Sequence, residues 1–489
     1  MNDIKNWKDY IKEFIANDEE LYFNDIPNEK SLEFLEEQIP IIELPDKIIE
    51  RTYYFRWWTY RKHIKKTISG YVITEFLPEV SWSTEHNTIS CAANFHIREG
   101  RWLKDSEGII KNYVNFWLTF PKKMFSYSMW LVAVVEEYCQ IHGDWAFAES
   151  NFEKFEEYFE KRLVNSETKT GLFFSKDYED GMEVGISGSG LRPTINSYVY
   201  ADAMALSRLA KRKGLEQKKE HYRKFATELR EKILDNLWDG DFFKTIPEEC
   251  VKECNGTRPE IPKKNNVREL IGYVPWCFGI PDSHMARAFE YLLSRDGFYT
   301  EYGLTTAEQS HSRYMEPHKH ECLWNGPIWP FATSQVLLGL ANALRSNADM
   351  RVSKNDYVML LRQYAASHRR ILPSGEVVDW IDENMDPKNG EWLARRILEE
   401  QNWPEEKGKR ERGKDYNHSL FCDLVLSGLL GIHEGIKGEL AVEPLIPEEW
   451  MYFRVQNLYF HGECYEILFD RDGTYYGEGK GIRIRRKGK

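Results

Sequence analysis

Helical periodicity dominates this chain from about residue 45 to residue 432. Apolar side chains recur at spacings of three and four, which places them on one face of an α-helix. Other segments are apolar on nearly every face, which is typical of buried helices. Two kinds of helix, one with a charged face and one without, predict two concentric layers of helices. The one-sided segments include 48–67, 126–143, 151–164, 218–238 and 355–372, and the apolar ones are 326–344 and 419–432.

The periodicity changes after Gly431, where polar and apolar residues begin to alternate. Alternation with a period of two predicts β-strands, and His461-Gly462 and the stretch 470–473 have the composition of hairpin turns. A small antiparallel β unit is therefore expected at the C-terminal end, with the basic stretch 483–489 as a solvated tail. The predicted division is an N-terminal helical extension (1–44), a helical domain (45–432) and a β appendage (433–489).

Composition favours a small, uncharged polar ligand. The 16 Trp and 27 Tyr exceed what packing usually requires, and such amphipathic rings suit a carbohydrate site. A net charge of −12 argues against the basic surface that nucleic acid or an anionic membrane needs. We therefore expect a small carbohydrate substrate, with neither nucleic acid nor membrane as a partner. The oligomeric state does not follow from the sequence.

The N-terminal residues and the cysteines predict a cytoplasmic protein. The first residues lack a basic leader followed by an apolar run, and no later segment reaches the ~18 apolar residues of a membrane span. The eight cysteines are scattered through a long chain, which favours reduced thiols over a disulfide framework.

An acidic, glycine-rich loop precedes one of the buried-type helices. Four acids lie among four glycines in residues 177–190, and Pro193 begins the helix. A carboxyl group held in a partly dry loop has a raised pKa and stays protonated near neutrality, as a general acid requires. Asp180 and Glu183 are the candidates for that role. The alternative is a solvated turn that is merely rich in acids.

Four further clusters of polar and aromatic residues lie at junctions between a loop and a helix, so a ring of helices would bring them to one opening. The Trp residues would offer flat faces to sugar C–H groups, and the Arg, Asn and His side chains would bind hydroxyls. Each also has a structural explanation, as core or as a satisfied packing residue. His318, His320 and Glu321 lack a clear further ligand, so no metal or cofactor is expected. The candidate binding residues are Trp102, Trp324, Trp329, Asn325, Arg101, Arg192, Asn196, His418, Glu85 and His86.

Two of these clusters resemble a known family. Leu-Trp-Asn-Gly-Pro-Ile-Trp-Pro (323–330) and Glu-Asn-Met-Asp-Pro-Lys-Asn-Gly-Glu (383–391) are similar to the paired motifs of glycoside hydrolase family 63 and the mannosylglycerate-hydrolase-like enzymes. Their Gly-Met-Asp-Asn-Ser segment carries the general acid, and Gly-Met-Glu (181–183) stands in its place here. The sequence departs from the family in that Glu replaces Asp, the following Asn-Ser is missing, and Asn384 and Met385 replace aromatic residues.

The resemblance covers most of residues 45–432 and implies an (α/α)6 toroid, hydrolysis of a glycosidic bond with inversion, and Glu383 as the general base. It leaves the general acid open between Glu183 and Asp180. It also leaves open which glucoside or mannoside, in an exo-acting reaction on a small oligosaccharide or glycoside, would be the substrate.

Two other functions remain open at this point. A sugar epimerase or isomerase on the same kind of toroid would use histidines as its acid–base pair, and the chain offers His86, His96, His311 and His418. A carbohydrate-binding protein without catalysis is the other. Two carboxylates facing the cavity would favour the hydrolase, and two histidines the epimerase.

Overall fold

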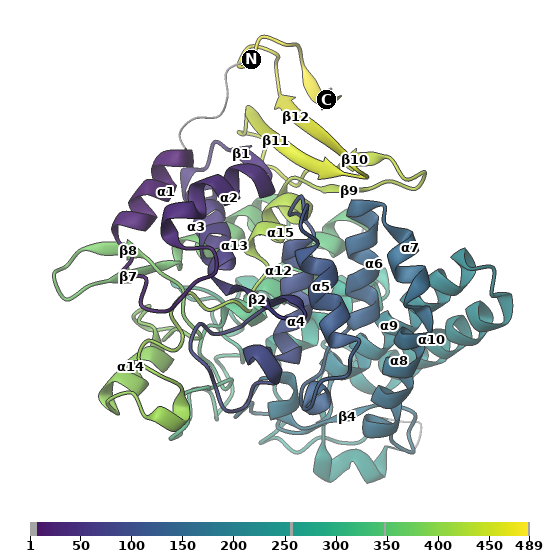
Figure 1. Ribbon diagram of the computed structural model, residues 1–489. Helices are drawn as coiled ribbons and strands as arrows, with labels where there is room; N and C mark the ends of the chain where they lie inside the picture. Colours follow the sequence, from purple (N-terminus) through teal and green to yellow (C-terminus); the bar gives the residue numbers. More distant parts are fainter. Residues whose placement is uncertain (1–6, 255–257, 347–348, 488–489) are drawn as a thin grey trace.

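The computed structural model of the protein describes residues 7–254, 258–346 and 349–487 (Figure 1). Within these ranges, six inner helices form a closed ring, in which each contacts the next and the last contacts the first. The predicted mainly α fold, with two layers of helices, is confirmed. The inner helices are α4 (Ser90–Gly100), α6 (Leu131–His142), α9 (Pro193–Arg212), α11 (Val274–Cys277), α12 (Pro330–Arg345) and α15 (Phe421–Asp423), which continues as a π-helix over Leu424–Leu429.

The second layer surrounds this ring, with one outer helix before each inner helix in the chain. Most outer helices are apolar on one face and most inner helices on nearly every face, which explains the two layers. The outer helix α10 (Glu216–Leu237) buries one stripe that includes Tyr222, Leu229 and Ile233, whereas most of the inner helix α12 is buried. The outer helices are α3 (Lys47–His63), α5 (Ile109–Trp117), α8 (Phe152–Ser166), α10 (Glu216–Leu237), the 3₁₀ helix Ser283–Leu293 and α13 (Lys354–Ala366). Shorter helices are α1 (Trp7–Ala16), α2 (Ser31–Gln38), α7 (Trp145–Ser150) and α14 (Leu393–Glu400).

The predicted C-terminal antiparallel β unit is present. Its sheet has the order β1-β11-β12-β13, and His461 and Gly462, both with positive φ, form the predicted turn between β11 and β12. The stretch 483–489 is not simply a tail, because β13 pairs with β12 through residue 486. The strands are β1 (Ile41–Glu43), β11 (Tyr452–Phe460), β12 (Glu463–Asp470) and β13 (Gly481–Arg486), with β9 (Ile432–Glu434) and β10 (Leu440–Val442) as a separate hairpin.

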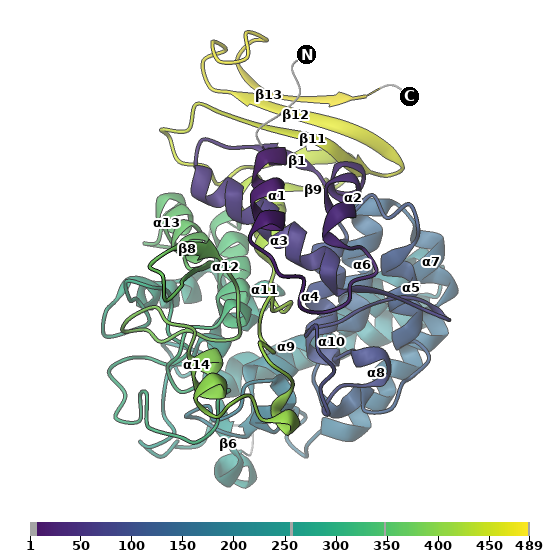
Figure 2. The ribbon, with the colours of Figure 1, turned by 60° about the vertical axis from the view of Figure 1, so that its left-hand side comes forward.

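The N-terminal segment belongs to the same end of the molecule as the C-terminal sheet. Strand β1 pairs with β11, so that Ile42 lies opposite Val455. Both views show the sheet above helices α1 and α2. The opposite end of the molecule carries β4 (Phe174–Ser175) in Figure 1 and β6 (Ile246–Pro247) in Figure 2. The division into three domains stays a prediction, and this pairing is a contact between its first and third parts.

Small antiparallel pairs of strands connect the helices at several places. Every strand pairing within the described residues is antiparallel. In the same part of the chain, no helix combines the length and apolar character that crossing a membrane requires. The pairs are β2 (Ile64–Thr67) with β3 (Gly70–Ile73), β7 (Arg369–Ile371) with β8 (Val377–Asp379), and β5 (Gly190–Leu191) with both β4 (Phe174–Ser175) and β6 (Ile246–Pro247).

Candidate active site

A cavity of about 330 Å³ lies where the inner helices begin. Residues from the loops that lead into five of these helices, or from the first turn of the helix, line it. Its size is at the small end of ligand pockets, which suits one or two sugar rings. The contributors from these five junctions are Cys91 for α4, Tyr127 for α6, Glu183 for α9, Trp329 for α12, and Tyr416 and His418 for α15.

The acidic loop places Glu183 at this cavity by giving its other acids structural roles. The Asp177 carboxylate accepts hydrogen bonds from the backbone N–H groups of Tyr178 (3.0 Å) and Val184 (3.2 Å). Glu179 accepts one from the backbone N–H of Lys176 at 2.9 Å. These bonds fold the loop back on itself. Glu183 is the acid of this loop that lines the cavity.

Val184, directly after Glu183, has a left-handed backbone conformation with φ of 63°. This is strained for a β-branched residue, at a cost of roughly 1–3 kcal/mol. Two hydrogen bonds hold the conformation: the Val184 N–H donates to Asp177, and the Glu183 carbonyl accepts from the Trp324 N–H at 3.1 Å. The loop therefore fixes the direction of the Glu183 side chain against local strain.

Val184→Gly should leave stability unchanged or raise it by about 1 kcal/mol, because glycine adopts positive φ without strain although it gains freedom in the unfolded chain. If the strain serves to aim Glu183, turnover should fall in the same variant. Urea unfolding gives the first quantity and steady-state kinetics the second. Clear destabilisation of the glycine variant would contradict the assignment of strain.

The two sequence motifs pair with each other directly. Ile328 and Met385 exchange backbone hydrogen bonds of 2.9 and 2.8 Å. Asn384 adds a bond from its side-chain amide to the Glu321 carbonyl at 3.0 Å. The Asp-Pro-x-x-Gly turn closes on itself, since Gly390, with φ of 73°, donates to the Asp386 carbonyl at 2.9 Å. These bonds hold Glu383 at the cavity wall.

Glu383 is 3% exposed and is paired with a buried arginine. The Arg412 Nε donates to Glu383 Oε2 at 3.1 Å and its Nη2 donates to the same oxygen. Arg412 also binds Glu321 at 3.0 Å, and Lys407 binds Glu321 at 2.9 Å. Burial raises the pKa of Glu383 above its usual value, and Arg412 opposes that rise by favouring the carboxylate.

Glu183 has a different electrostatic environment. Burial raises its pKa to about 8, and the carboxylates of Asp177, Glu383 and Glu75 act in the same direction. It therefore carries a proton at neutral pH. One carboxyl group of the cavity is held protonated and another is paired with a cation, which is the division of roles found between a general acid and a general base.

Trp329 and Trp324 form a two-layer aromatic stack beside the cavity. Trp329 lines the cavity, and its indole N–H donates to the Leu323 carbonyl at 2.7 Å. Trp324 lies parallel to it, with ring centroids 4.5 Å apart and planes at 16°, but does not line the cavity. Trp324 therefore supports the Trp329 ring and is not itself part of the cavity wall. The neighbouring Asn325 is also buried, and its amide donates to the Glu316 carbonyl at 2.8 Å.

Asp180 does not line the cavity, contrary to the prediction that it competes with Glu183. It is 2% exposed and accepts hydrogen bonds from Arg192 Nε at 2.6 Å and from the Thr194 hydroxyl. Arg192 is thereby occupied as an ion-pair partner. Asn196 is bonded to both the N–H (2.8 Å) and the carbonyl (3.0 Å) of Phe173. These three residues hold the start of α9 together instead of facing a sugar.

The predicted sugar-binding residues Arg101 and Trp102 are structural as well. Arg101 Nη2 and the Trp102 indole N–H both donate to Asp423 Oδ1 at 2.7 Å. Asp423 lies at the junction with the π-helix, and neither Arg101 nor Trp102 lines the cavity. Glu85 and His86 lie on the surface, in the exposed 3₁₀ turn Glu85–Asn87. These four residues are therefore not part of the lining of this cavity.

The histidines bear on the choice between hydrolase and epimerase. Of the four histidines considered, only His418 lines the cavity, although His320 also reaches it. His96 is buried between Tyr113 and the Asn417 carbonyl, bonded at 3.1 and 2.5 Å. The His418 ring stacks on Phe331, with centroids 3.8 Å apart. The carboxyl pair is the stronger candidate for acid–base chemistry.

Several cavity residues escaped the sequence analysis. Arg412 lies in a highly charged stretch that looks like a solvated surface, and nothing local marks it as buried. Glu75 is the one charged residue in the stretch 71–78, and a lone acid in such a stretch is a weak signal of a buried, partnered carboxylate. The other lining residues that were missed are Trp82, Cys91, Tyr127, Cys322, Glu406, Lys407 and Tyr416.

Known proteins resemble this chain in both sequence and structure. The family model of the mannosylglycerate hydrolase MGH1-like glycoside hydrolase domain matches residues 85–419, and that of the C-terminal domain of glycosyl hydrolase family 65 matches residues 436–489. A comparison with curated proteins found no match.

Among solved structures, one described as a sialidase is 34% identical over 98% of this chain and 43% of its own, with a TM-score of 0.88. A GH78 family rhamnosidase of Bacillus sp. GL1 is 13% identical over 92% of this chain and 42% of its own, with a TM-score of 0.57. The chain thus spans less than half the length of these two proteins.

A GH63 mannosylglycerate hydrolase from Thermus thermophilus is 11% identical over 76% of this chain and 100% of its own, with a TM-score of 0.51. At that identity the likeness concerns the fold, and it agrees with the ring of paired helices seen here. The match of the family model extends over more than half of the sequence and includes the acidic loop and both paired motifs. This chain belongs to the mannosylglycerate hydrolase MGH1-like glycoside hydrolase family.

Proposed function

We propose that this protein hydrolyses a neutral glycoside with inversion, with Glu183 as general acid and Glu383 as general base. The observation that carries the proposal is the pair of carboxyl groups on one cavity in opposite electrostatic environments. Glu183 is desolvated and protonated at neutral pH, with a pKa of about 8. Glu383 is bound to Arg412, which favours its ionised form.

The reaction follows from these protonation states. Glu183 gives its proton to the glycosidic oxygen as the bond from that oxygen to the anomeric carbon breaks. Glu383 takes a proton from water as the water oxygen bonds to the opposite face of that carbon. In an inverting enzyme the two carboxyl groups stand about 6.5–9.5 Å apart to admit this water. Trp329 offers an apolar face to the sugar ring.

The charges around the cavity support a neutral substrate. Five glutamates line it, and its two lysine and arginine side chains are already paired: Lys407 with Glu321, and Arg412 with Glu321 and Glu383. An anionic sugar would meet repulsion from the carboxylates and would have to compete for these two cations. The similar structure described as a sialidase therefore does not make a sialoside the favoured substrate here.

A panel of nitrophenyl glycosides and disaccharides tests the proposal. Purified protein should hydrolyse a neutral glucoside or mannoside at least ten-fold faster, by kcat/KM, than a nitrophenyl sialoside. Nuclear magnetic resonance of the first-formed product should show the anomer opposite to that of the substrate. Sialoside as the best substrate would refute the assigned substrate class, retained configuration would refute inversion, and binding without turnover would favour a carbohydrate-binding protein.

The pH dependence of kcat/KM should be bell-shaped. Activity should fall as pH rises through about 8, because Glu183 loses the proton it must donate. Activity should also fall as the pH drops through the pKa of Glu383, because the base becomes protonated. That pKa is raised above the ordinary 4.5 of glutamate. Initial rates with an alkyl glycoside, whose leaving group needs the proton from Glu183, show both limbs. In Glu183→Gln the alkaline limb should disappear, and its persistence would assign it to another group.

A further inference from the structure

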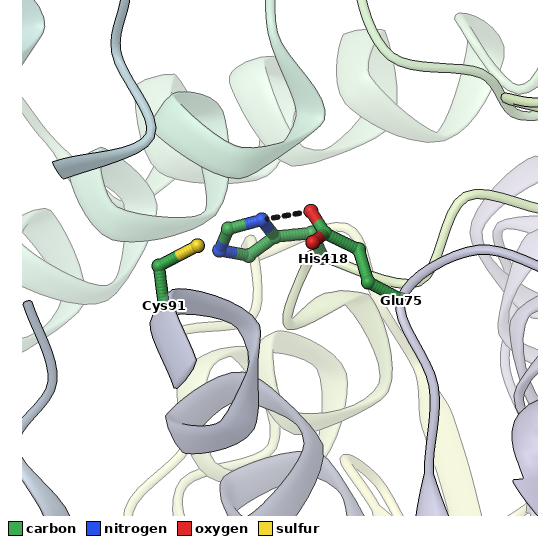
Figure 3. Close-up of side chains that lie close together, drawn as sticks. All are labelled: Glu75, Cys91 and His418. Carbon is green, nitrogen blue, oxygen red and sulfur yellow. Dashed lines mark hydrogen bonds and ion pairs between the residues drawn. The ribbon is translucent and has the colours of Figure 1, made fainter. Parts of the chain in front are cut away.

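A cluster of three side chains in the cavity transfers no proton in the proposed hydrolysis. Ligand atoms of Glu75, Cys91 and His418 all lie within 4.8 Å of one another, and all three residues are buried (Figure 3). They come from the segment after β3, from the first turn of α4 and from the segment before α15. All three also line the cavity.

The orientation of the His418 ring leaves one nitrogen open. Nδ1 is bonded to Glu75 Oε1 at 2.7 Å and also lies 3.1 Å from the Tyr416 hydroxyl. Phe331 stacks on one face of the ring, and the edge of Phe95 packs against it with centroids 4.8 Å apart. Nε2 is buried and has no hydrogen-bond partner among the residues that the structure describes, and His418 is only 1% exposed. Figure 3 shows this side of the ring turned toward the Cys91 sulfur.

An unpartnered buried imidazole nitrogen beside a thiol is suited to a thiophilic divalent cation. Nitrogen and sulfur are the ligands that zinc and cadmium prefer, and a histidine ligand commonly donates its other N–H to a carboxylate. Glu75 is placed to accept that bond. The charge agrees, because the Glu75 carboxylate beside the imidazole attracts a cation.

We propose that Cys91 Sγ and His418 Nε2 bind a thiophilic divalent cation of the zinc class, with Glu75 orienting the imidazole. On binding, the Cys91 thiol releases its proton to solvent and the sulfur bonds to the ion, while His418 supplies the Nε2 lone pair. The remaining coordination positions face the cavity and are filled by water. Because the ion would occupy space beside Glu183, it would inhibit hydrolysis; this second part rests on the proposed function.

Cadmium added alone to the purified protein tests the binding without any need for activity. A Cys250→Ser/Cys254→Ser background removes the other pair of thiols that lie close in sequence. In that background one equivalent of cadmium should produce a thiolate-to-metal charge-transfer band in the ultraviolet. Cys91→Ser should abolish the band, and Cys91→Ala serves if the serine variant is unstable. Cys322→Ser, which removes another thiol of the same cavity, should keep it.

Affinity measurements separate ligation from a general effect of charge. Glu75→Gln should weaken zinc binding about 10- to 100-fold, as expected for a residue that orients a ligand. Glu406→Gln, which removes another carboxylate of the cavity, should weaken it much less. Zinc binding unchanged by Cys91→Ser, or no band in the folded background protein, would overturn the proposal.

The inhibitory part is tested separately. Zinc should raise the KM of the parent protein for a neutral nitrophenyl glycoside, with much less effect on the Cys91→Ser variant. If zinc binds through Cys91 and the KM does not change, the inhibition is refuted and the site remains. If the protein hydrolyses no glycoside, the proposed function fails while the binding result still decides the cation site.

Discussion

Glu383→Gln should lower turnover by about 10²–10⁴-fold, the range that general acid–base catalysis contributes. The amide keeps the shape of the side chain but cannot take a proton from water. Substrate binding should change little, since Trp329 and the rest of the cavity wall are untouched. Arg412 loses one carboxylate partner but keeps Glu321 at 3.0 Å. The protein should therefore still fold.

Glu321→Gln is the matched control for this experiment. Glu321 lines the same cavity and binds the same arginine, so its replacement removes an equal charge from the same ion-pair network. It should lower kcat much less than Glu383→Gln. Steady-state kinetics together with thermal unfolding of both variants give the comparison. Near-normal turnover by a folded Glu383→Gln variant, or equal losses in the two variants, would contradict the role of Glu383.

Glu183→Gln should reduce hydrolysis of an alkyl glycoside by a similar factor of about 10²–10⁴, but that of the matching nitrophenyl glycoside far less. A poor leaving group needs the proton that Glu183 supplies, whereas nitrophenolate departs without one. The ratio of kcat/KM for the two substrates is the measurement. This dependence on the leaving group distinguishes a lost general acid from a disturbed cavity.

Asp180→Asn provides the contrast on the same loop. Asp180 is buried against Arg192, so its replacement should destabilise the protein by roughly 3–5 kcal/mol because the arginine is left without its counter-charge. The Asp180→Asn protein that does fold should lose no more kcat/KM on the alkyl glycoside than on the nitrophenyl glycoside. If Asp180→Asn showed that dependence and Glu183→Gln did not, the two assignments would have to be exchanged.

The local pattern of the sequence was sufficient to predict the helices, the C-terminal hairpin and the position of the motifs. The periods of 3.6 and 2 depend on which face of a helix or strand is buried, so they are visible in any short window. They predicted helices such as α10 and α12, and the hairpin at His461-Gly462. The glycines and acids of residues 177–190 marked a loop, and the resemblance of 383–391 marked Glu383. Each of these depends on neighbours within about a dozen residues.

The closure of the ring decided which of the candidate side chains meet. The sequence did not distinguish Asp180 from Glu183. In the structure Asp180 is hydrogen-bonded to Arg192 and Thr194, whereas Glu183 lines the cavity. Arg101 and Trp102 looked like ligands for a sugar, yet both are bound to Asp423, more than 300 residues away. The pairing of a buried polar group depends on what the fold brings within about 3 Å of it.

The electrostatics of the site were likewise decided by tertiary structure alone. The local sequence identifies Glu183 as an acid, but its pKa of about 8 comes mainly from burial, with contributions from Asp177 on the same loop and from Glu383 and Glu75 on distant segments. Arg412 reads as part of a charged surface until the fold buries it against Glu383, and Glu75 reaches His418 across 343 residues. The sequence by itself determined the helices, the hairpin and the candidate acids, because these follow from local periodicity and composition. Only the closed ring decided which acids are protonated, paired or hidden, because desolvation and charge pairing depend on neighbours in space.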